Sequence, residues 1–134
     1  MDIDSYLGVH TAALKLREQR TELLANNLAN ADTPGFKARD LDFRSALAAA
    51  TSPAGARGTL AAPAHGVSLA TSGTEVSTDA FLRFRTPLAP SLDGNTVDTQ
   101  LEQAAFADNS VRYQATLSFL SSRFRSLMTA ITGQ

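Results

Sequence analysis

The carboxylate and imidazole side chains are the groups of this sequence that could perform acid–base chemistry. Asp40 and Asp42 stand two residues apart, so they would share one face of an extended strand, as a catalytic carboxylate pair could. The sequence holds two imidazoles, those of His10 and His65. A hydrolase would need a pocket that gathers both carboxylates and His65, and no spacing frames one. We therefore favour a solvated strand face for the two carboxylates.

Metal and thiol chemistry have little support in the sequence. The chain contains no cysteine, which excludes disulfides and thiolate ligands. Two histidines that lie far apart in sequence cannot form a multi-histidine metal centre within one chain. His10 falls on the seam side of the N-terminal helix described below, and we expect it to be packed or interfacial. The sequence predicts no catalytic residue, no metal site and no cofactor.

Charge and composition also exclude several binding functions. The 134 residues carry 12 Lys plus Arg and 13 Asp plus Glu, whereas a dedicated nucleic-acid binder normally has a strong basic excess. Gly55 and Gly58 lie in an Ala-rich segment and do not join a strand to a helix, so they do not form a phosphate loop. We expect no nucleic acid and no small-molecule substrate. No apolar run is long enough to span a membrane, and residues 1–6 lack the basic start of a cleaved secretory signal.

Two long amphipathic helices are predicted, and they would position the side chains described above. The first is predicted over residues 1–31, because no Gly or Pro interrupts residues 9–33 and apolar residues recur on a seven-residue pattern. Its seam consists of Leu7, Leu14, Leu24 and Leu28. The segment 32–44 then supplies a stop. Pro34-Gly35 suits a type II turn, and Leu41 and Phe43 alternate with aspartates as in a short extended segment.

The middle of the chain, residues 45–97, is predicted to be mainly a loop. Its first part is dominated by Ala, Gly, Pro, Ser and Thr, which bury too little apolar surface to offset the entropy of ordering. Residues 45–50 could form a short helix, and residues 80–88 alternate as in a short strand. Asp93-Gly94-Asn95 is a turn signal.

A second long helix is predicted over residues 98–134. Thr99 and Glu102 stand three apart, as in a capping box, and Gly133 supplies a stop. An a/d seam with alternating spacings of four and three is formed by Tyr113, Leu117, Leu120, Phe124, Leu127 and Ile131. This helix is also basic, through Arg112, Arg123 and Arg125. The arginines either complement the helix dipole on a solvated face or contact an acidic partner.

The lengths of these helices predict the architecture. A helix of about 34 residues is about 50 Å long, which exceeds the diameter of about 36 Å expected for a compact globule of this size. The fold class is therefore mainly α and elongated, with the two terminal helices paired side by side like a coiled coil, a central loop and short extended segments. Two helices alone leave much of their apolar seams uncovered, so we expect other chains to cover the rest.

Two sequence blocks resemble the bacterial flagellar axial proteins, the family that includes rod, hook and filament components. Residues 25–37 read Ala-Asn-Asn-Leu-Ala-Asn-Ala-Asp-Thr-Pro-Gly-Phe-Lys, and residues 90–98 read Pro-Ser-Leu-Asp-Gly-Asn-Thr-Val-Asp. Together with their flanks they cover residues 12–43 and 88–133, and as a pair they are similar to proximal-rod proteins. The motif positions are Asn26, Asn27, Asn30, Asp32, Thr33, Pro34, Gly35, Phe36, Lys37, Asp93, Gly94 and Asn95.

The resemblance implies a structural protein of the flagellar basal body and not an enzyme. It implies a helical assembly in the proximal rod, within the periplasm, that transmits motor torque and lines the export channel with its paired terminal helices. The chain would be exported by the flagellar type III apparatus without signal cleavage. Its partners would be further copies of itself, the rod protein FlgC and other rod proteins, the adaptor FliE and the MS-ring protein FliF. Two alternatives remain open, namely another proximal-rod component such as FlgC and a soluble helical adaptor or export chaperone.

Overall fold

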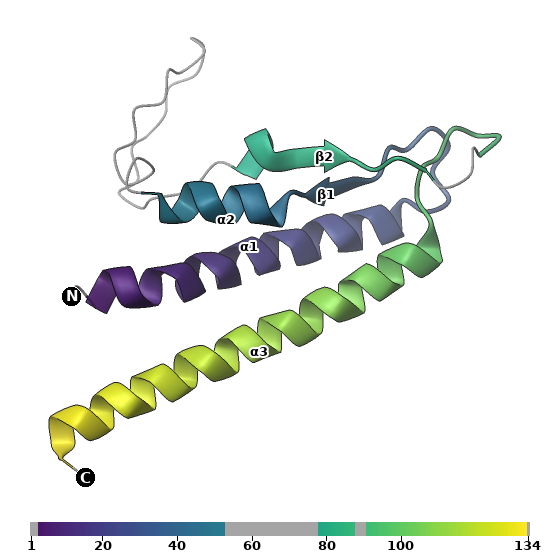
Figure 1. Ribbon diagram of the computed structural model, residues 1–134. Helices are drawn as coiled ribbons and strands as arrows, with labels where there is room; N and C mark the ends of the chain where they lie inside the picture. The colour runs from purple at the N-terminus through teal and green to yellow at the C-terminus, as the bar shows by residue number, and fades with distance from the viewer. Residues whose placement is uncertain (1–2, 53–77, 88–90, 134) are drawn as a thin grey trace, which may run out of the picture.

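A computed structural model describes residues 3–52, 78–87 and 91–133 of the chain. The helix α1 (Ile3–Ala29) runs through the middle of the molecule, as Figure 1 shows. On one side of it lie the helix α2 (Phe43–Thr51) and a two-stranded sheet, and on the other side lies the helix α3 (Thr99–Thr132). The chain is thus mainly α-helical and elongated, as predicted. His65 and most of the Ala-rich segment lie outside the described residues.

The two long helices are antiparallel neighbours. α1 has 27 residues and α3 has 34, so their lengths are about 40 Å and 51 Å. Asn27 contacts Glu102 and Thr21 contacts Asn109, which fixes the register of the pair. Stepping along both helices from these contacts puts Ile3 opposite about residue 126. The last turns of α3 therefore extend past the start of α1, at the end of the molecule where Figure 1 marks both termini.

The start of α3 differs from the predicted capping box. The N-cap is Asp98, whose carboxylate accepts hydrogen bonds from the backbone N–H groups of Gln100 and Leu101. Glu102 does not turn back to Thr99, because its side chain is buried between α3 and the rest of the molecule. Helix α3 ends where Gly133 adopts a left-handed conformation with φ of 71°.

The sheet joins segments that are far apart in sequence. Strand β1 (Arg39–Leu41) pairs antiparallel with β2 (Leu82–Phe84), with Asp40 opposite Arg83. A 3-10 turn (Thr78–Phe81) leads into β2. The predicted extended segment ends at Leu41 and does not include Phe43, because the Asp42 carboxylate caps α2 by accepting from the Ser45 N–H. The short helix that the sequence allowed over residues 45–50 is therefore present, and it begins two residues earlier, at Phe43.

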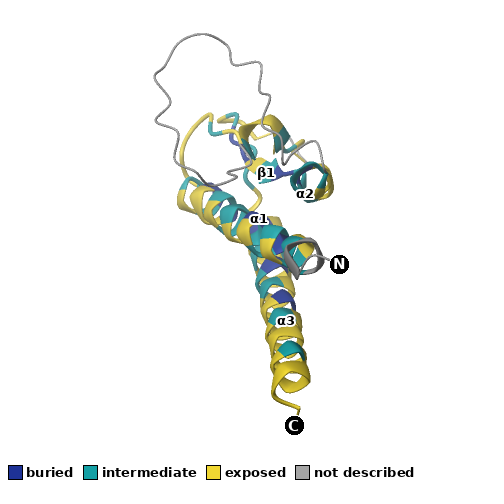
Figure 2. Ribbon diagram, turned by 90° about the vertical axis from the view of Figure 1, so that its left-hand side faces the viewer, coloured by how far each residue is buried: buried dark blue, intermediate teal, exposed yellow. Residues whose placement is uncertain are grey.

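A small apolar core lies between α1 and the layer formed by the sheet and α2. Leu16, Leu41 and Ala46 are buried in it, and partly buried apolar residues surround them, namely Leu23, Phe43, Leu47, Phe81 and Leu82. Figure 2 shows buried residues around α1 and a largely exposed surface toward the free end of α3. The core thus fixes α2 and the sheet on α1, while the outer half of α3 contributes little to it.

The predicted seams are only partly internal. On α1, Leu24 is fully buried, whereas Leu7, Leu14 and Leu28 are half-buried. On α3, the half-buried residues are Tyr113, Leu120 and Leu127, and the exposed ones are Leu117, Phe124 and Ile131. The residues of α3 that are buried are polar, namely Glu102, Asn109 and Thr116. The interface within the chain is therefore rotated relative to the apolar seam read from the sequence, and it covers only one of the two lines of that seam.

Candidate functional site

The two motif blocks meet at the end of the molecule where α1 stops and α3 begins. The buried side chain of Asn95 donates from its amide nitrogen to the backbone oxygens of Asn30, Ala31 and Thr33, at 3.1, 2.7 and 3.0 Å. These oxygens belong to the turn that follows α1, where carbonyls are no longer paired by a regular helix. Asn95 binds them from a segment more than sixty residues away. We call this contact between residues 30–37 and 91–97 the turn tie.

Backbone bonds complete the turn tie. The Gly35 N–H donates to Asp93 O and the Thr96 N–H donates to Phe36 O, at 2.9 and 3.0 Å. The Lys37 ammonium donates to Gly94 O at 2.6 Å. Gly35 closes the predicted turn with φ of 72°, a conformation that glycine adopts without a steric penalty. The turn tie therefore fixes the chain reversal that sets α1 and α3 side by side.

The remaining motif residues have different environments. Asn26, Asp32, Thr33 and Pro34 are exposed, whereas Asn27 is buried beneath β1. The Asn27 amide nitrogen donates to Arg39 O at 2.7 Å, and its carbonyl oxygen accepts from the Arg39 N–H at 3.1 Å. This pair of bonds attaches the edge of the sheet to α1.

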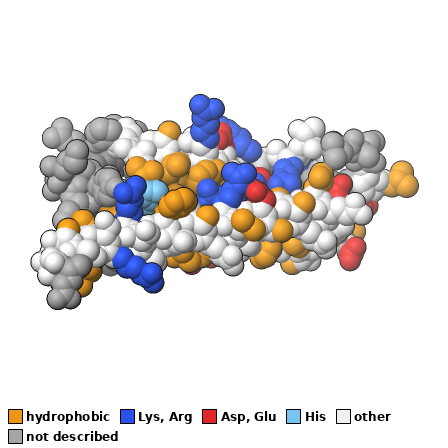
Figure 3. Space-filling model, turned by 60° about the horizontal axis from the view of Figure 1, so that its bottom comes forward, with side chains coloured by type: hydrophobic (Ala, Val, Ile, Leu, Met, Phe, Trp, Pro, Cys, Tyr) orange, Lys and Arg blue, Asp and Glu red, His pale blue; other side chains and the backbone are white. Residues whose placement is uncertain are grey.

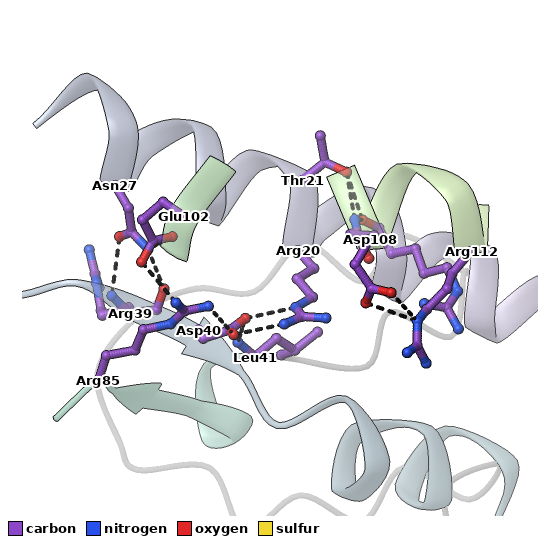
Figure 4. Close-up of polar contacts among 12 residues, drawn as sticks. Arg20, Thr21, Asn27, Arg39, Asp40, Leu41, Arg85, Glu102, Asp108 and Arg112 are labelled. Atoms are coloured by element: carbon purple, nitrogen blue, oxygen red, sulfur yellow. Dashed lines mark hydrogen bonds and ion pairs between the residues drawn. The ribbon is translucent and has the colours of Figure 1, made fainter. Parts of the chain in front are cut away.

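An ion-pair network connects α1, the sheet and α3, as Figure 4 shows. Arg20 of α1 forms a bidentate pair with the Asp40 carboxylate, with both N–O distances at 2.9 Å. Arg85, just after β2, contacts the same carboxylate at 2.7 Å and the Glu102 carboxylate of α3 at 3.1 Å. Asn27 also donates to Glu102, at 3.1 Å. One continuous network thus holds the three layers in a fixed arrangement.

The electrostatics of Asp40 follow from this network. Burial would raise the pKa of its carboxyl group, but the hydrogen bonds from Arg20 and Arg85 outweigh burial and lower the pKa below the ordinary value. The hydrogen bond to Asp40 in turn raises the pKa of Arg20. Asp40 therefore differs from the solvated carboxylate expected from the sequence. Its negative charge is a structural element of the sheet, and Asp42 has a separate task as a helix cap.

A second polar contact lies nearer the middle of the two long helices. The fully buried Asn109 donates from its amide nitrogen to Arg17 O and to the Thr21 hydroxyl, both at 2.9 Å. Its side-chain oxygen has no hydrogen-bond partner within the described part of the chain. The Arg17 guanidinium stacks 4.4 Å from the centroid of the Phe43 ring, and burial lowers the pKa of Arg17. These contacts join α3 to α1 and α1 to α2.

The polar groups described above hold the helices and the sheet together. Within residues 3–52, 78–87 and 91–133, no group of three or more acidic or histidine side chains could hold a metal ion. His10 is half-buried on α1, ten residues before Arg20 of the ion-pair network, which is about 15 Å along the helix axis. Among the same residues, no helix is both long and apolar enough to cross a bilayer.

The apolar surface that remains exposed lies mainly on α3. Its exposed large residues are Leu101, Val111, Leu117, Phe119, Phe124, Met128 and Ile131. Three of them, Leu117, Phe124 and Ile131, belong to the seam predicted from the sequence and are 40%, 50% and 80% exposed. Together with Met128, we call them the α3 stripe. Among residues 3–52, 78–87 and 91–133 nothing covers it, and such surface is typical of a contact with another chain.

Sequence reasoning missed the functional residues of the ion-pair network. Nothing in the spacing of these four residues connects them, because they lie on α1, on β1, just after β2 and on α3, namely Arg20, Asp40, Arg85 and Glu102. A signal was present at Glu102 and Asn109, which are polar residues seven apart on the apolar face of a helix. Such residues often specify how two helices align.

Comparisons with known proteins place these features in a family. A family model described as flagella basal body rod protein matches residues 7–37. A flagellar basal body rod protein FlgB from Cereibacter sphaeroides is 48% identical over 128 residues, which cover 96% of this chain and 94% of that protein. The FlgB proteins of Yersinia enterocolitica and of Escherichia coli K12 are 43% and 42% identical, and each alignment covers 96% of this chain and at least 94% of the relative.

Proposed function

This chain belongs to the FlgB family of flagellar basal body rod proteins, and from this premise we propose that it builds the proximal part of the rod through the α3 stripe. Membership makes it a structural component of the basal body that assembles with other rod components. The alternatives of a different rod component such as FlgC and of a soluble adaptor or export chaperone are not favoured.

The observation that carries the proposal is the exposure of the α3 stripe. Figure 3 views the molecule from the side on which α3 lies. It shows hydrophobic side chains in several patches over the long helices. Burying one Leu or Phe side chain is worth about 1.5–3 kcal/mol, so a few such contacts per neighbour give a stiff joint. A stiff joint is what a rod needs to transmit torque. The neighbours would be other copies of this chain, FlgC and other rod proteins, with FliE and the MS-ring protein FliF at the base.

The same proposal covers the path of export and the position of the paired helices. The pair formed by α1 and α3 would line the export channel, with the layer of α2 and the sheet directed outward. The small core supports this, because a chain with few buried apolar residues unfolds readily for export through the type III apparatus. We propose that the chain reaches the periplasmic rod by this route without cleavage of a signal peptide.

The experiment compares two aspartate substitutions on α3 in cells that carry no other copy of the chain. Phe124→Asp would place a carboxylate without a partner in the joint, and such burial costs several kcal/mol. We expect it to be exported but to be at least about tenfold depleted in purified basal bodies. Ser118→Asp is the matched control, because Ser118 is exposed and lies about 120° around the helix axis from Phe124.

Two readouts decide the result, namely the amount of chain outside the cytoplasm and the amount in basal bodies. Export of both variants with selective loss of Phe124→Asp from basal bodies supports the proposal. Normal incorporation of Phe124→Asp would show that the α3 stripe faces solvent in the rod, and would overturn this assignment of the joint.

A further inference from the structure

A line of polar residues faces α1 where an apolar seam would be expected. Glu102, Asn109 and Thr116 follow one another at intervals of seven residues, so they lie on one face of α3. They are 1%, 0% and 9% exposed, and they are the buried residues of this helix. We call them the polar line.

The polar line and the α3 stripe compete for the same interface. Thr116 and Leu117 are consecutive residues, so they lie about 100° apart around the helix axis. Phe124 lies seven residues beyond Leu117, on nearly the same side of α3. A partial rotation of α3 about its own axis would move Leu117 and Phe124 onto α1 and would turn Thr116 outward. The hydrophobic effect favours that rotation.

Hydrogen bonds of the polar line oppose the rotation. Asn109 would lose its bonds to Arg17 O and the Thr21 hydroxyl, and Glu102 would lose its bond to Asn27 and its ion pair with Arg85. Asn109 contributes little net stability to the helix pair, because its buried side-chain oxygen has no hydrogen-bond partner among the described residues. Replacing both partners of such a buried hydrogen bond by apolar groups of the same shape can be neutral or stabilising. Stability alone therefore does not explain a buried asparagine there.

We propose that Asn109, supported by Glu102, is a positioning residue that holds α3 in the rotational setting that keeps the α3 stripe outside its own chain. The polar line thereby prevents the chain from covering the surface that it presents to a neighbour. That the neighbour is a rod subunit rests on the proposed function, whereas the rotational setting is a property of the single chain. The two are tested separately.

Because the chain has no cysteine, single engineered cysteines report the rotation directly. Thr116→Cys and Leu117→Cys are made in the full chain, each alone and each with Asn109→Leu, and the rate of reaction with a soluble thiol reagent is measured on monomer. In the parent chain the cysteine at 117 should react faster than the one at 116. With Asn109→Leu we expect the ratio of the two rates to fall by about tenfold, because the penalty for leaving the buried Asn109 amide unbonded no longer opposes rotation and only the contacts of Glu102 remain.

Two controls isolate the effect of the buried amide. Gln103→Leu adds the same side chain at an exposed site of α3 and should leave the ratio unchanged. Asn109→Gln keeps an amide donor and should retain most of the parent ratio. An unchanged ratio in Asn109→Leu would overturn the proposal. A rise in both rates would also overturn it, because it would show that Asn109 holds the helices together and does not set their rotation. Neither result would change the proposed function in the basal body rod, which is tested separately by the incorporation of Phe124→Asp into basal bodies.

Discussion

Asp40 and Asp42 are the same residue type two positions apart, yet they have different roles. Asp40 pairs with two arginines from distant elements, and Asp42 caps the helix that begins beside it. The cap could be predicted from local sequence, because a capping aspartate needs only the next few residues. The ion pairs could not be predicted, because Arg20 and Arg85 lie 20 and 45 residues from Asp40 and are brought to it only by the packing of the sheet on α1.

The Asp40 pairs predict how stability depends on pH. The pKa of Asp40 is lower in the folded chain than its ordinary value of 3.8. As the pH falls, the unfolded chain therefore binds a proton first, and the free energy of unfolding decreases until the pH has passed below the folded pKa. Urea unfolding of the parent chain should show this loss from just above pH 4 downward. Asp40→Asn should flatten the slope in that range.

At neutral pH the same variant has a direct effect on stability. Asp40→Asn leaves Arg20 and Arg85 without their shared carboxylate, and breaking a partly buried pair should lower the free energy of unfolding by about 2–4 kcal/mol. Asp79→Asn, at an exposed carboxylate, is the comparison. Equal stability of Asp40→Asn and the parent chain at both neutral and acidic pH would contradict the role given to Asp40.

Asn95 offers a second test at the scale of one side chain. Asn95→Ala removes the donor to three backbone oxygens at the end of α1, and we expect the free energy of unfolding to fall by about 1–3 kcal/mol. Asn26→Ala is the matched control, since Asn26 is exposed and its substitution should change stability by at most about 0.5 kcal/mol. Similar unfolding midpoints for the two variants would show that water replaces Asn95 without loss.

At the scale of elements, apolar periodicity predicted both long helices, and Pro34, Gly35 and Gly133 predicted where helices end. The rotation of α3 against α1 could not be predicted in the same way. The most regular apolar line, from Tyr113 to Ile131, was predicted to be the face of α3 that packs on α1. The polar partners of Glu102 and Asn109 on α1 decide the rotation instead, and they lie 75 and at least 88 residues away in sequence.

Amide hydrogen exchange should follow this uneven packing along α3. Its buried residues end at Thr116, and the residues beyond are half-buried or exposed. We expect amides of residues 103–113 to be protected about tenfold or more above those of residues 124–131 in the monomer, because local opening is easier where less surface is buried. Uniform protection to the end of α3 would mean that the isolated chain packs this helix along its full length.

At the scale of the molecule, helix length alone predicted an elongated shape with surface left for other chains. The structure adds the register, which sets the last turns of α3 beyond the start of α1. Those turns carry Met128 and Ile131, which are 60% and 80% exposed. Under the proposed function, folding of the single chain and joining of neighbouring chains depend on different parts of the same helix.

This separation predicts the behaviour of a chain truncated after Leu127. The removed residues have no part of α1 opposite them, so the free energy of unfolding should change by at most about 0.5 kcal/mol. Incorporation into purified basal bodies should nevertheless be lost, because part of the α3 stripe is missing. The full-length variant Met128→Ala/Ile131→Ala retains the helix length and should weaken incorporation in the same direction. If it assembles normally while the truncated chain does not, the end of α3 acts through its length or its backbone, and the apolar joint lies nearer to Leu117 and Phe124.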